Sequence, residues 1–459
     1  MLAEYQLIII GGGLSGLAAG IRAARFGRRT LLLEQHSLPG GLNSYYFRHG
    51  HLLETGLHAM TNFARPADKR APLNRLFRQL KLSRKRFVTR EQFGSQIIFP
   101  GSRLAFSNDL SLLKSEVARE FPRCSSSFSD LIRAMEEFDP FAPAPRRSAR
   151  AFLHARLDNP LLENMLLLPL MVYGNAEEYD MDLAQFAIMF RALFLEGFFR
   201  PEQTIREFLA LLVEQYKGFG GELRLKTPVA EMTRHGDRVT GVRLADGEEI
   251  RAKAVLSTAG LPATTHLSGW KLDLEKYTGK MSFMETISLL PAQKIRALSR
   301  GKTIIFYSHL EDWQYRRPEA LIDPSWGVIC FPENFHGIEA GETMQLRVTH
   351  AADYHRWRQL APVDYEAAKE CCSQESRRMV GKIVGNYGRD IVYQDSFTPL
   401  TIERFTGKRE GAVYGSPVKM KDGYTPLQNL FIAGTDQGFL GIVGSMLSGV
   451  TIVNQHLLQ

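Results

Sequence analysis

An α/β fold with a parallel sheet is predicted by three features of residues 7–34. The first is the apolar run Leu7–Ile10, which has the length of a short buried parallel strand. The second is a glycine-rich turn, after which the stretch from Ser15 to about Phe26 carries small residues suited to a helix packed closely on that strand. The third is another apolar run, Thr30–Leu33, which ends at Glu34. A strand, turn, helix, strand and acid in this order are typical of a unit that binds an adenine dinucleotide.

Each glycine of the turn has its own structural role in a Rossmann-like phosphate site. Gly11 permits the tight turn, Gly13 lets the backbone approach a pyrophosphate, and Gly16 lets the helix pack on the strand. The helix start at Leu14 and Ser15 presents unpaired N–H groups and the positive end of the helix dipole to phosphates. A glycine-rich turn can also be only a turn, but the flanking strands and the acid favour nucleotide binding.

Glu34 indicates which dinucleotide is bound. At the end of the second strand its carboxylate can accept hydrogen bonds from both hydroxyls of a ribose, which favours an unphosphorylated adenosine ribose, as in FAD or NAD. The chain has only one such fingerprint, because Gly218-Phe219-Gly220-Gly221 ends a helix instead of opening one. A second domain that binds NAD is therefore not expected.

Length and composition describe an ordinary globular chain of two or more domains. The chain has 459 residues, of which 44% are apolar and 23% are charged, and no apolar run approaches the roughly 18–20 residues of a membrane span. No signal peptide is expected, since the first apolar run is a four-residue strand. The cysteines lack metal-ligand spacing, so we expect no metal site and a reducing, cytoplasmic location. They are Cys124, Cys330, Cys371 and Cys372.

Positive charge is concentrated in residues 65–90, which hold ten Lys or Arg and one acid within a chain of net charge +8. Leu73, Leu76, Phe77 and Leu80 recur there at helical spacing, so Pro72–Leu82 is predicted to be a basic amphipathic helix. Two interpretations stay open: a solvated helix docked by its apolar face, or a patch that contacts an anionic membrane surface. Nucleic acid is not an expected partner, because no recognised nucleic-acid module accompanies the charge.

The middle of the chain is predicted to be largely helical. A hairpin is expected at residues 96–106, around Pro100-Gly101, and a proline-rich loop at residues 140–150. Residues 159–199 form an unusually apolar helical stretch, which is either core or the lining of a substrate tunnel. One helix is expected over Pro201–Gly218.

Strands dominate the next part of the chain. Short strands are predicted at Glu222–Leu225, Val229–Thr233 and Ala254–Ser257, with hairpin turns around Gly236-Asp237 and Asp246-Gly247. Period-two segments then predict a second, mostly antiparallel sheet, followed by a long helix over about residues 365–384. These segments are Met284–Leu290, Thr303–Tyr307, Gly327–Phe331 and Met344–Thr349.

The predicted organisation is therefore a discontinuous nucleotide-binding domain with a second domain of mixed sheet and helices. The nucleotide-binding domain is assigned residues 1–62, 215–262 and 395–459, and the substrate or cap domain is assigned residues 63–214 and 263–394.

Four further motifs resemble the flavin amine oxidase and phytoene desaturase superfamily. Pro39-Gly40-Gly41-Leu42 follows the fingerprint, and the turn Glu54-Thr55-Gly56-Leu57-His58 is most similar to the retinol saturase branch. Thr398–Gly415 is similar to a motif shared by carotenoid isomerases, desaturases and retinol saturases. Near the end, a predicted strand at Leu430–Ala433 leads through Gly434-Thr435-Asp436 to a helix from about Ile442.

This resemblance implies a Rossmann-like FAD-binding domain and a non-covalent FAD, since no cysteine lies in the segments that contact flavin. In the family, the acid of the last turn, here Asp436, hydrogen-bonds FAD, and the following helix points its N-terminus at the flavin ring, where it stabilises negative charge. The implied FAD-binding residues are Gly11, Gly13, Leu14, Ser15, Gly16, Glu34, Gln35, Gly40, Gly41, Leu42, Gly56, Leu57, His58, Val229, Gly434, Asp436, Gly441, Ile442 and Val443.

Two departures from the family pattern stand out. Where the family has Pro-x-Gly-Gly, this chain has Pro201-Glu202-Gln203-Thr204, which implies a different local shape. The turn before the last helix reads Gly434-Thr435-Asp436 instead of Gly-Asp, which again favours the saturase-like branch.

The function implied by the resemblance is a FAD-dependent oxidoreductase or isomerase that acts on a hydrophobic polyene or isoprenoid by hydride transfer at flavin N5. His58 and Glu403 are the candidates for proton transfer. Their structural alternatives are that His58 only shapes the pocket and that Glu403 pairs with Arg404 or Lys408.

Two alternative functions remain on the same scaffold. One is oxidation of an amine or another small substrate, and the other is a non-catalytic lipid carrier, as in the prenyl-GTPase dissociation inhibitors. The direction of the reaction, the electron donor or acceptor, and the extent of membrane association of this cytoplasmic protein stay open.

Overall fold

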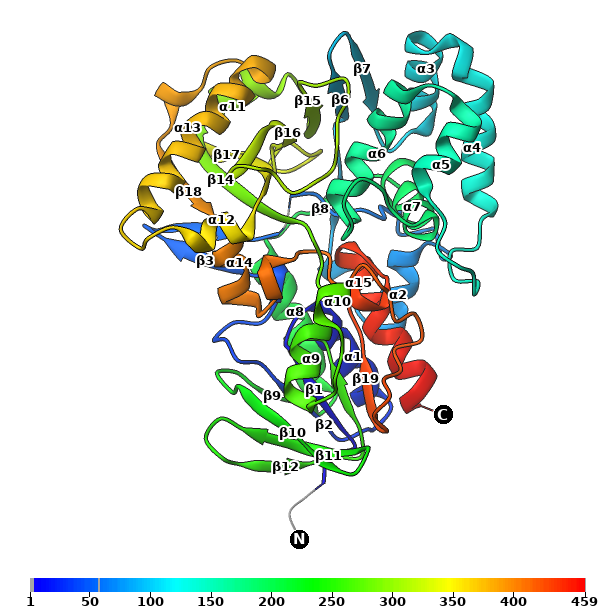
Figure 1. The fold of residues 1–459 in the computed structure, drawn as a ribbon, viewed down its shortest axis with the longest axis vertical. Coiled ribbons are helices and arrows are strands. Elements are labelled where there is room, and N and C mark those ends of the chain that lie inside the picture. The colour runs from blue at the N-terminus through cyan, green and yellow to red at the C-terminus, as the bar shows by residue number, and fades with distance from the viewer. Residues whose placement is uncertain (1–3, 57, 459) are drawn as a thin grey trace.

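The structure is a computed structural model that describes residues 4–56 and 58–458. Figure 1 shows two lobes, one built on a parallel sheet and the other on a larger mixed sheet. The predicted α/β class and the two kinds of sheet are confirmed.

The parallel sheet has five strands in the order β19-β13-β1-β2-β9. Each neighbouring pair is parallel, and β1 and β2 are buried along their whole length, as their uninterrupted apolar sequences predict. The bounds are β1 Leu7–Ile10, β2 Thr30–Leu33, β9 Glu222–Arg224, β13 Val255–Ser257 and β19 Leu430–Ile432. The sheet therefore draws on the start, the middle and the end of the chain.

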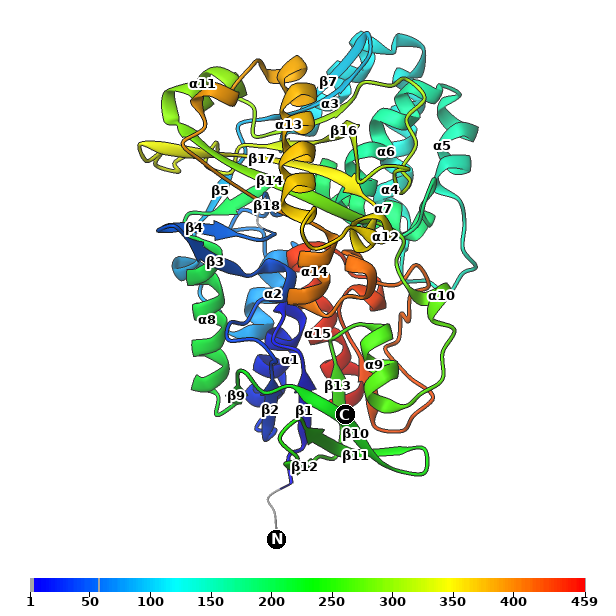
Figure 2. The ribbon, with the colours of Figure 1, turned by 60° about the vertical axis from the view of Figure 1, so that its left-hand side comes forward.

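Helices α1 (Leu14–Arg25) and α15 (Gly441–Ile452) pack together against this sheet (Figure 2). A Cβ added to Gly16 would lie 2.0 Å from the carbonyl oxygen of Gly11, and one added to Gly449 would lie 2.1 Å from that of Ser15. Only glycine permits both approaches, so the predicted packing role of Gly16 is confirmed.

The basic helix α2 (Pro72–Leu80) docks on this lobe by its apolar face. Leu73, Leu76, Phe77 and Leu80 are buried in the same core as α1 and α8 (Ile205–Gly218). The apolar face is therefore occupied by protein, and only the basic face of α2 is open to a partner. Residues 72–80 and 205–214 thus belong to the core of the parallel-sheet lobe, although the predicted boundaries assign them to the second domain.

A three-stranded antiparallel sheet extends the lobe, with the two hairpin turns where the sequence predicts them. Its strands are β10 Val229–His235, β11 Arg238–Leu244 and β12 Glu249–Arg251, and α9 (Leu261–Ser268) follows β13.

The second lobe is built on a seven-stranded sheet in the order β18-β14-β17-β16-β15-β6-β7. All its pairs are antiparallel except β6 with β15. The bounds are β6 Ser95–Phe99, β7 Ser102–Phe106, β14 Ser282–Pro291, β15 Ile304–Ser308, β16 Ile322–Cys330, β17 Thr343–Ala352 and β18 Tyr393–Phe397.

Helices cover this sheet on both faces (Figures 1 and 2). One group is α3 Leu110–Glu120, α4 Ser125–Glu137, α5 Ala149–Leu157, α6 Pro160–Gly174 and α7 Leu183–Phe190. The other is α11 Ala292–Ser299 and α13 Tyr365–Val384. Short elements complete the lobe and its junction with the first: β3 Tyr45–Arg48, β4 His51–Glu54, β5 Thr89–Glu91, β8 Phe199–Pro201, α10 Leu274–Tyr277, α12 Tyr354–Gln359 and α14 Pro399–Thr406.

The apolar stretch 159–199 is core, not a tunnel lining. Most of its apolar side chains belong to the cluster that α3–α7 form against the seven-stranded sheet. Only Val172 and Tyr173 of this stretch reach the large cavity described below.

The helix predicted over Pro201–Gly218 begins later than expected. Phe199–Pro201 is instead the strand β8, paired with β5, and α8 starts at Ile205. Thr204 and Glu207 form a capping box that fixes this start. Across the described residues, no helix is both long and apolar enough to cross a membrane.

Candidate functional site

One cavity of about 1260 Å³ runs from the carboxyl ends of β1 and β2 to the face of the seven-stranded sheet. Most of the predicted FAD-binding residues line it, so distant parts of the sequence do converge. Those that line it are Gly11, Gly13, Leu14, Ser15, Glu34, Gln35, Gly40, Gly41, Leu42, Gly56, His58, Val229, Gly434, Gly441 and Ile442. Gly16, Asp436 and Val443 are not among the lining residues, and Leu57 falls outside the described residues.

The N-terminus of α1 offers hydrogen-bond donors to this cavity. Gly13 caps the helix without a side-chain hydrogen bond, and a Cβ added to it would meet nothing within 4 Å, so open space lies above the turn. Among residues 4–56 and 58–458, the buried Ser15 hydroxyl has no hydrogen-bond partner, and neither has that of Thr435, which also lines the cavity. Two unpaired hydroxyls and a free helix N-terminus suit an anionic group such as a diphosphate.

Glu34 lies on the cavity wall with its carboxylate fixed by the backbone. One oxygen accepts a hydrogen bond from the Gly12 N–H at 2.7 Å, and the other from the His36 N–H at 2.9 Å. Since a carboxylate has about four lone-pair sites, each oxygen keeps one for a ligand hydroxyl.

The N-terminus of α15 forms another part of the wall. Leu440 caps this helix without a side-chain hydrogen bond, and Gly441 and Ile442 line the cavity. Val443 instead points into the core between α15 and the parallel sheet.

Asp436 does not face the cavity, in contrast to its predicted contact with the cofactor. Its carboxylate is buried, and it accepts hydrogen bonds from the backbone N–H of Leu261 at 2.5 Å and of Ser416 at 2.6 Å. The extra residue in this turn, Thr435, takes the place at the wall. Asp436 thus acts on the start of α9 and on a neighbouring loop.

Glu54, the acid of the second motif, is also a structural residue. Its buried carboxylate accepts a hydrogen bond from the backbone N–H of Ile205 at 2.6 Å, at the start of α8, and forms an ion pair with Arg200. The Pro201–Thr204 turn therefore lies next to this motif.

A buried polar cluster stands at the other end of the cavity. Nε2 of His58 lies 2.7 Å from Oε2 of Glu285, and Nε of Arg347 donates to Oε1 of Glu285 at 2.6 Å. The Thr349 hydroxyl donates to Oε2 of Glu285 at 3.3 Å. The side chains of Glu285 and Arg347 are 3% and 0% exposed. We call His58, Glu285, Arg347 and Thr349 the inner cluster.

The seven-stranded sheet brings this cluster together. In the register of β14 and β17, Glu285 stands opposite Thr349, and Arg347 is the diagonal neighbour on the same face. Side chains alternate along each strand, so Phe283 shares the face of Glu285 and also lines the cavity.

Within the inner cluster, Glu285 and Arg347 each stabilise the charged form of the other. Burial alone would raise the pKa of the Glu285 carboxyl, but Arg347 and His58 outweigh burial, so this pKa lies below its usual value. Burial likewise opposes the charge of Arg347, and Glu285 more than compensates, so the pKa of the guanidinium is raised. Both groups are therefore charged at neutral pH.

Tyr173 completes the inner end of the cavity. Its hydroxyl is buried and has no hydrogen-bond partner among the described residues, and burial raises its pKa well above the usual value. The hydroxyl of Tyr414, another lining residue, donates to the carbonyl of Val172.

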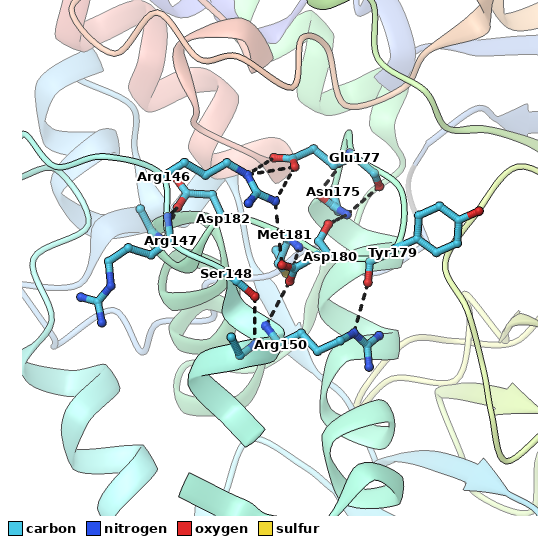
Figure 3. Close-up of polar contacts among 12 residues, drawn as sticks. Arg146, Arg147, Ser148, Arg150, Asn175, Glu177, Tyr179, Asp180, Met181 and Asp182 are labelled. Carbon is cyan, nitrogen blue, oxygen red and sulfur yellow. Dashed lines mark hydrogen bonds and ion pairs between the residues drawn. The ribbon is translucent and has the colours of Figure 1, made fainter. Parts of the chain in front are cut away.

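A polar network fixes the end of the helix that carries Tyr173. Figure 3 shows the loop after α6 bound to residues 146–150, which lead into α5: Arg146 pairs with Glu177 at 2.6 Å, and the backbone N–H of Arg150 donates to Asp180 at 3.0 Å. Within the loop, the Asn175 amide donates to the carbonyls of Glu177 and Asp180. These contacts hold the C-terminal end of α6 in one position.

Glu403, the second predicted proton-transfer residue, does not line the cavity. Its carboxylate accepts hydrogen bonds from the Tyr354 hydroxyl at 2.6 Å and from the backbone N–H of Glu410 at 2.9 Å. Its partners are therefore neither Arg404 nor Lys408, and its surroundings support a structural role.

Sequence reasoning missed Glu285, Arg347 and Tyr173. One signal was present: Glu285 and Arg347 each stand as a lone charge within an apolar segment predicted to be a strand. Lysine, arginine, aspartate and glutamate are rarely buried unless they are paired, so two such strands suggest a buried pair. The described residues contain no group of three or more His, Cys, Asp or Glu side chains arranged to hold a metal ion.

The chain belongs to the flavin-containing amine oxidoreductase family, whose pattern it matches over residues 14–454. It is 23% identical to the chloroplastic prolycopene isomerase of Arabidopsis thaliana over 95% of this chain and 76% of that protein. It is 20% identical to the all-trans-retinol 13,14-reductase of Rattus norvegicus over 99% of this chain and 86% of that protein. The neurosporene-forming phytoene desaturase of Rhodobacter capsulatus is 28% identical over 55% of this chain and 52% of that protein.

Solved structures share the fold. An oxidoreductase from Methanosarcina mazei superposes with a TM-score of 0.69 at 15% identity over 98% of this chain and all of that chain. Putrescine oxidase bound to putrescine gives a TM-score of 0.67 at 13% identity over the full length of both chains. A RAB GDI from Plasmodium falciparum gives 0.56 at 12% identity over 100% of this chain and 99% of that chain.

Proposed function

We propose that this protein is a FAD-dependent oxidoreductase, a desaturase, saturase or isomerase, that acts on a hydrophobic polyene or isoprenoid. The observation that carries the proposal is the single cavity that joins the dinucleotide fingerprint to the buried inner cluster. The relatives named as acting on prolycopene, retinol and phytoene support the substrate class.

The cofactor is FAD, held without a covalent bond. Ser15, Thr435 and the start of α1 would hold the diphosphate, and Glu34 would hold the adenosine ribose. The start of α15, which lines the cavity, would hold the flavin end of the cofactor. No cysteine lines the cavity within the described residues, which supports non-covalent binding. When bound, FAD supplies two-electron hydride chemistry.

The substrate occupies the part of the cavity between the flavin region and the seven-stranded sheet. Apolar and aromatic side chains there exclude water and bind the hydrocarbon: Val172, Tyr173, Phe283, Val328, Val413 and Tyr414. His58 lies at the border of the two regions and exchanges a proton with the substrate.

Oxidation of an amine is the second candidate function. The pair of tyrosines at the inner end, Tyr173 and Tyr414, favours it, because aromatic faces attract an alkylammonium group. A lipid carrier without redox chemistry is the third, and the orphaned hydroxyls of Ser15 and Thr435 argue for a phosphate ligand instead of an empty nucleotide site.

Reconstitution with FAD tests the cofactor. We expect flavin absorption bands near 370 and 450 nm (rough general values) that remain with the protein after gel filtration and leave with FAD after acid denaturation. Glu34→Ala is expected to retain less FAD, because it removes the proposed contact with the adenosine ribose. A protein without flavin bands after reconstitution contradicts the enzyme proposal.

Identification of bound lipid tests the substrate. Mass spectrometry of an organic extract of the purified protein is expected to detect a polyene or isoprenoid. The FAD-loaded protein is then assayed with a panel of polyenes and of amines, each with oxygen or a quinone as electron acceptor. Turnover of amines alone would instead establish the second candidate.

Membrane contact is the remaining part of the proposal. The basic face of α2 and its flanks holds exposed cations without an ion pair among the described residues, and they attract an anionic lipid surface. These cations are Arg65, Lys69, Arg70, Arg75, Arg78, Lys81 and Lys85. Arg75→Glu/Arg78→Glu is expected to reduce co-sedimentation with vesicles rich in phosphatidylglycerol, and Arg133→Glu on the exposed side of α4 serves as the control. Equal sedimentation of both variants and the parent would exclude α2 as the contact.

A further inference from the structure

We propose that the inner cluster is a proton-transfer site in which Nδ1 of His58 is the reacting atom. Glu285 and Arg347 are its positioning residues, since they act through His58 and fix which of its nitrogens faces the substrate. This inference rests on the proposed function for the identity of the substrate, but the arrangement of the cluster stands on its own geometry.

The carboxylate of Glu285 uses all of its hydrogen-bonding capacity. Oε1 accepts from the Nε and terminal N–H groups of Arg347, and Oε2 lies within hydrogen-bond distance of Nε2 of His58 and of the Thr349 hydroxyl. An ionised carboxylate has about four lone-pair sites and no proton to donate. Each of the four sites therefore holds one partner.

This saturation assigns the tautomer of His58. Because the carboxylate can only accept, Nε2 of His58 must carry the hydrogen that lies between the two side chains. In neutral imidazole only one nitrogen is protonated, so Nδ1 then carries the lone pair. Among the described residues Nδ1 has no hydrogen-bond partner, and His58 lines the cavity. Nδ1 is thus the nitrogen available to a ligand.

Arg347 keeps this arrangement in one charge state. A buried carboxyl without a cation would take up a proton, and it could then donate to Nε2 and reverse the tautomer. Arg347 prevents this by its double contact with Oε1, and it is itself held by the carbonyl of Thr55, in the same turn as His58, at 3.3 Å. Thr55 and Arg347 thereby tie the turn to β17.

The other titratable groups around the pair do not compete for the proton. They are Tyr46, Tyr173, Tyr414 and Cys330, and burial raises the pKa of each of them. Two further carboxylates nearby have partners of their own. Asp395 accepts a hydrogen bond from the Tyr46 hydroxyl at 2.9 Å and lies 3.6 Å from Arg48, and Glu54 forms an ion pair with Arg200.

The step that this site performs is a simple acid–base transfer. A C–H or O–H bond of the substrate breaks, its electron pair stays on the substrate, and the proton forms an N–H bond at Nδ1. The imidazolium that results is stabilised by the ionised Glu285 across the Nε2–H bond. The reverse transfer delivers a proton to a substrate carbon or oxygen.

Nitrogen NMR of the histidine side chains tests the assignment without any turnover. The full-length protein with FAD is labelled with 15N-histidine, and the signal of His58 is identified by its loss in His58→Asn. The pH is raised until the histidine signals stop changing, and in this neutral form of His58 we expect a protonated Nε2 and an unprotonated Nδ1. A protonated Nδ1 would overturn the proposal.

Variants of the positioning residues test their role. Because Glu285→Gln leaves Arg347 buried without its partner, the matched variant is Glu285→Gln/Arg347→Met, which removes both charges together. In either variant that folds, we expect a mixture of the two tautomers of His58. A tautomer unchanged from the parent would show that Glu285 does not position His58.

Kinetics separate a positioning role from simple loss of structure. With a substrate from the panel above, His58→Asn is expected to lower kcat by about 10²–10⁴-fold, and Glu285→Gln by less, with little change in KM. An unchanged kcat in His58→Asn would overturn the proton-transfer role. If the protein binds no FAD or turns over no polyene, the tautomer can still be read, so failure of the proposed function is distinguished from failure of this inference.

Discussion

At the scale of single residues, two carboxylates of the family-like motifs are used as helix caps. Glu54 accepts a hydrogen bond from the first residue of α8, and Asp436 accepts one from the first residue of α9. The first four N–H groups of each helix lack a partner within the helix. A carboxylate there is also stabilised by the positive end of the helix dipole. Asp436 thereby fixes from behind the helix α9, which lines the cavity, whereas α8 does not reach it.

Asp436→Ala is expected to lower the free energy of unfolding by about 2 kcal/mol, because it leaves the buried N–H groups of Leu261 and Ser416 without acceptors. The measurement is urea unfolding followed by circular dichroism. Asp109→Ala, at the exposed N-cap of α3, is the control and is expected to cost about 1 kcal/mol. An Asp436→Ala protein as stable as the parent, but with weaker FAD binding, would restore the direct contact with the cofactor.

Ser15→Ala and Thr435→Val are each expected to weaken FAD binding by roughly five- to tenfold, about 1–1.4 kcal/mol, because each removes one hydrogen bond to the diphosphate. The free energy of unfolding without FAD should stay the same or rise, since each change removes a buried hydroxyl that has no partner in the described part of the chain. Isothermal titration of the apoprotein with FAD measures the affinity. Ser115→Ala on the exposed face of α3 is the control, and equal affinities in all variants would contradict the diphosphate position.

Single residues of the site were predictable only where the motif is local. Gly11, Gly13 and Glu34 follow from a few neighbouring elements, and all three line the cavity. Glu285 and Arg347 meet only through the register of β14 with β17, whose partners are about sixty residues apart. No local pattern specifies that register, so the sequence could indicate a buried pair but not its partner or place.

At the scale of elements, α2 illustrates what periodicity can and cannot decide. The spacing of Leu73, Leu76, Phe77 and Leu80 predicts the amphipathic helix, and the structure has it at Pro72–Leu80. The same spacing would suit a membrane surface or a protein core, and the choice depends on α1 and α15, which α2 contacts. Similarly, β8 was not predicted because its partner β5 lies more than a hundred residues away.

Leu76→Ala is expected to lower the free energy of unfolding by about 2–5 kcal/mol, because the side chain is fully buried in the core beneath α2. Thermal or urea unfolding of the apoprotein measures this loss. The matched surface change on the same helix, Arg75→Ala, is expected to alter stability by no more than about 0.5 kcal/mol. Equal stability of the two variants would mean that α2 is not docked on the lobe in solution.

At the scale of the whole molecule, the cavity lies between the two lobes and is lined by both. Bound FAD would contact the parallel sheet at one end and approach the seven-stranded sheet at the other. Removal of FAD is therefore expected to destabilise the protein as a unit, by about 2.7 kcal/mol relative to a solution with FAD at a hundred times its Kd. Scanning calorimetry measures the shift, and a single transition that moves with FAD concentration is the expected result. Two transitions, of which only one moves, would indicate that the cofactor contacts one lobe alone.

Acid is expected to destabilise the protein partly through Glu285. Since its pKa is lower in the folded protein than in the unfolded chain, its contribution is complete above about pH 4.3 and is lost as the pH falls through the folded pKa. On acidification from about pH 6 to about pH 3, which spans the usual pKa of a glutamate, the parent should therefore lose more stability than Glu285→Gln/Arg347→Met. Thermal midpoints across this range measure the difference, and parallel curves would contradict an ionised buried Glu285.

The order of strands in the parallel sheet limits when this sheet can form during synthesis. β1 lies between β2 and β13, and β13 pairs with β19, which comes more than four hundred residues after β1. During synthesis, β1, α1 and β2 are made before β9, β13 and β19, and α1 lacks its neighbour α15 until residue 452 has been made. Sheets whose strands pair over such long sequence separations fold slowly, because the loops between them must close first. The site at the ends of β1 and β2 is therefore completed only after β19 and α15 have been made.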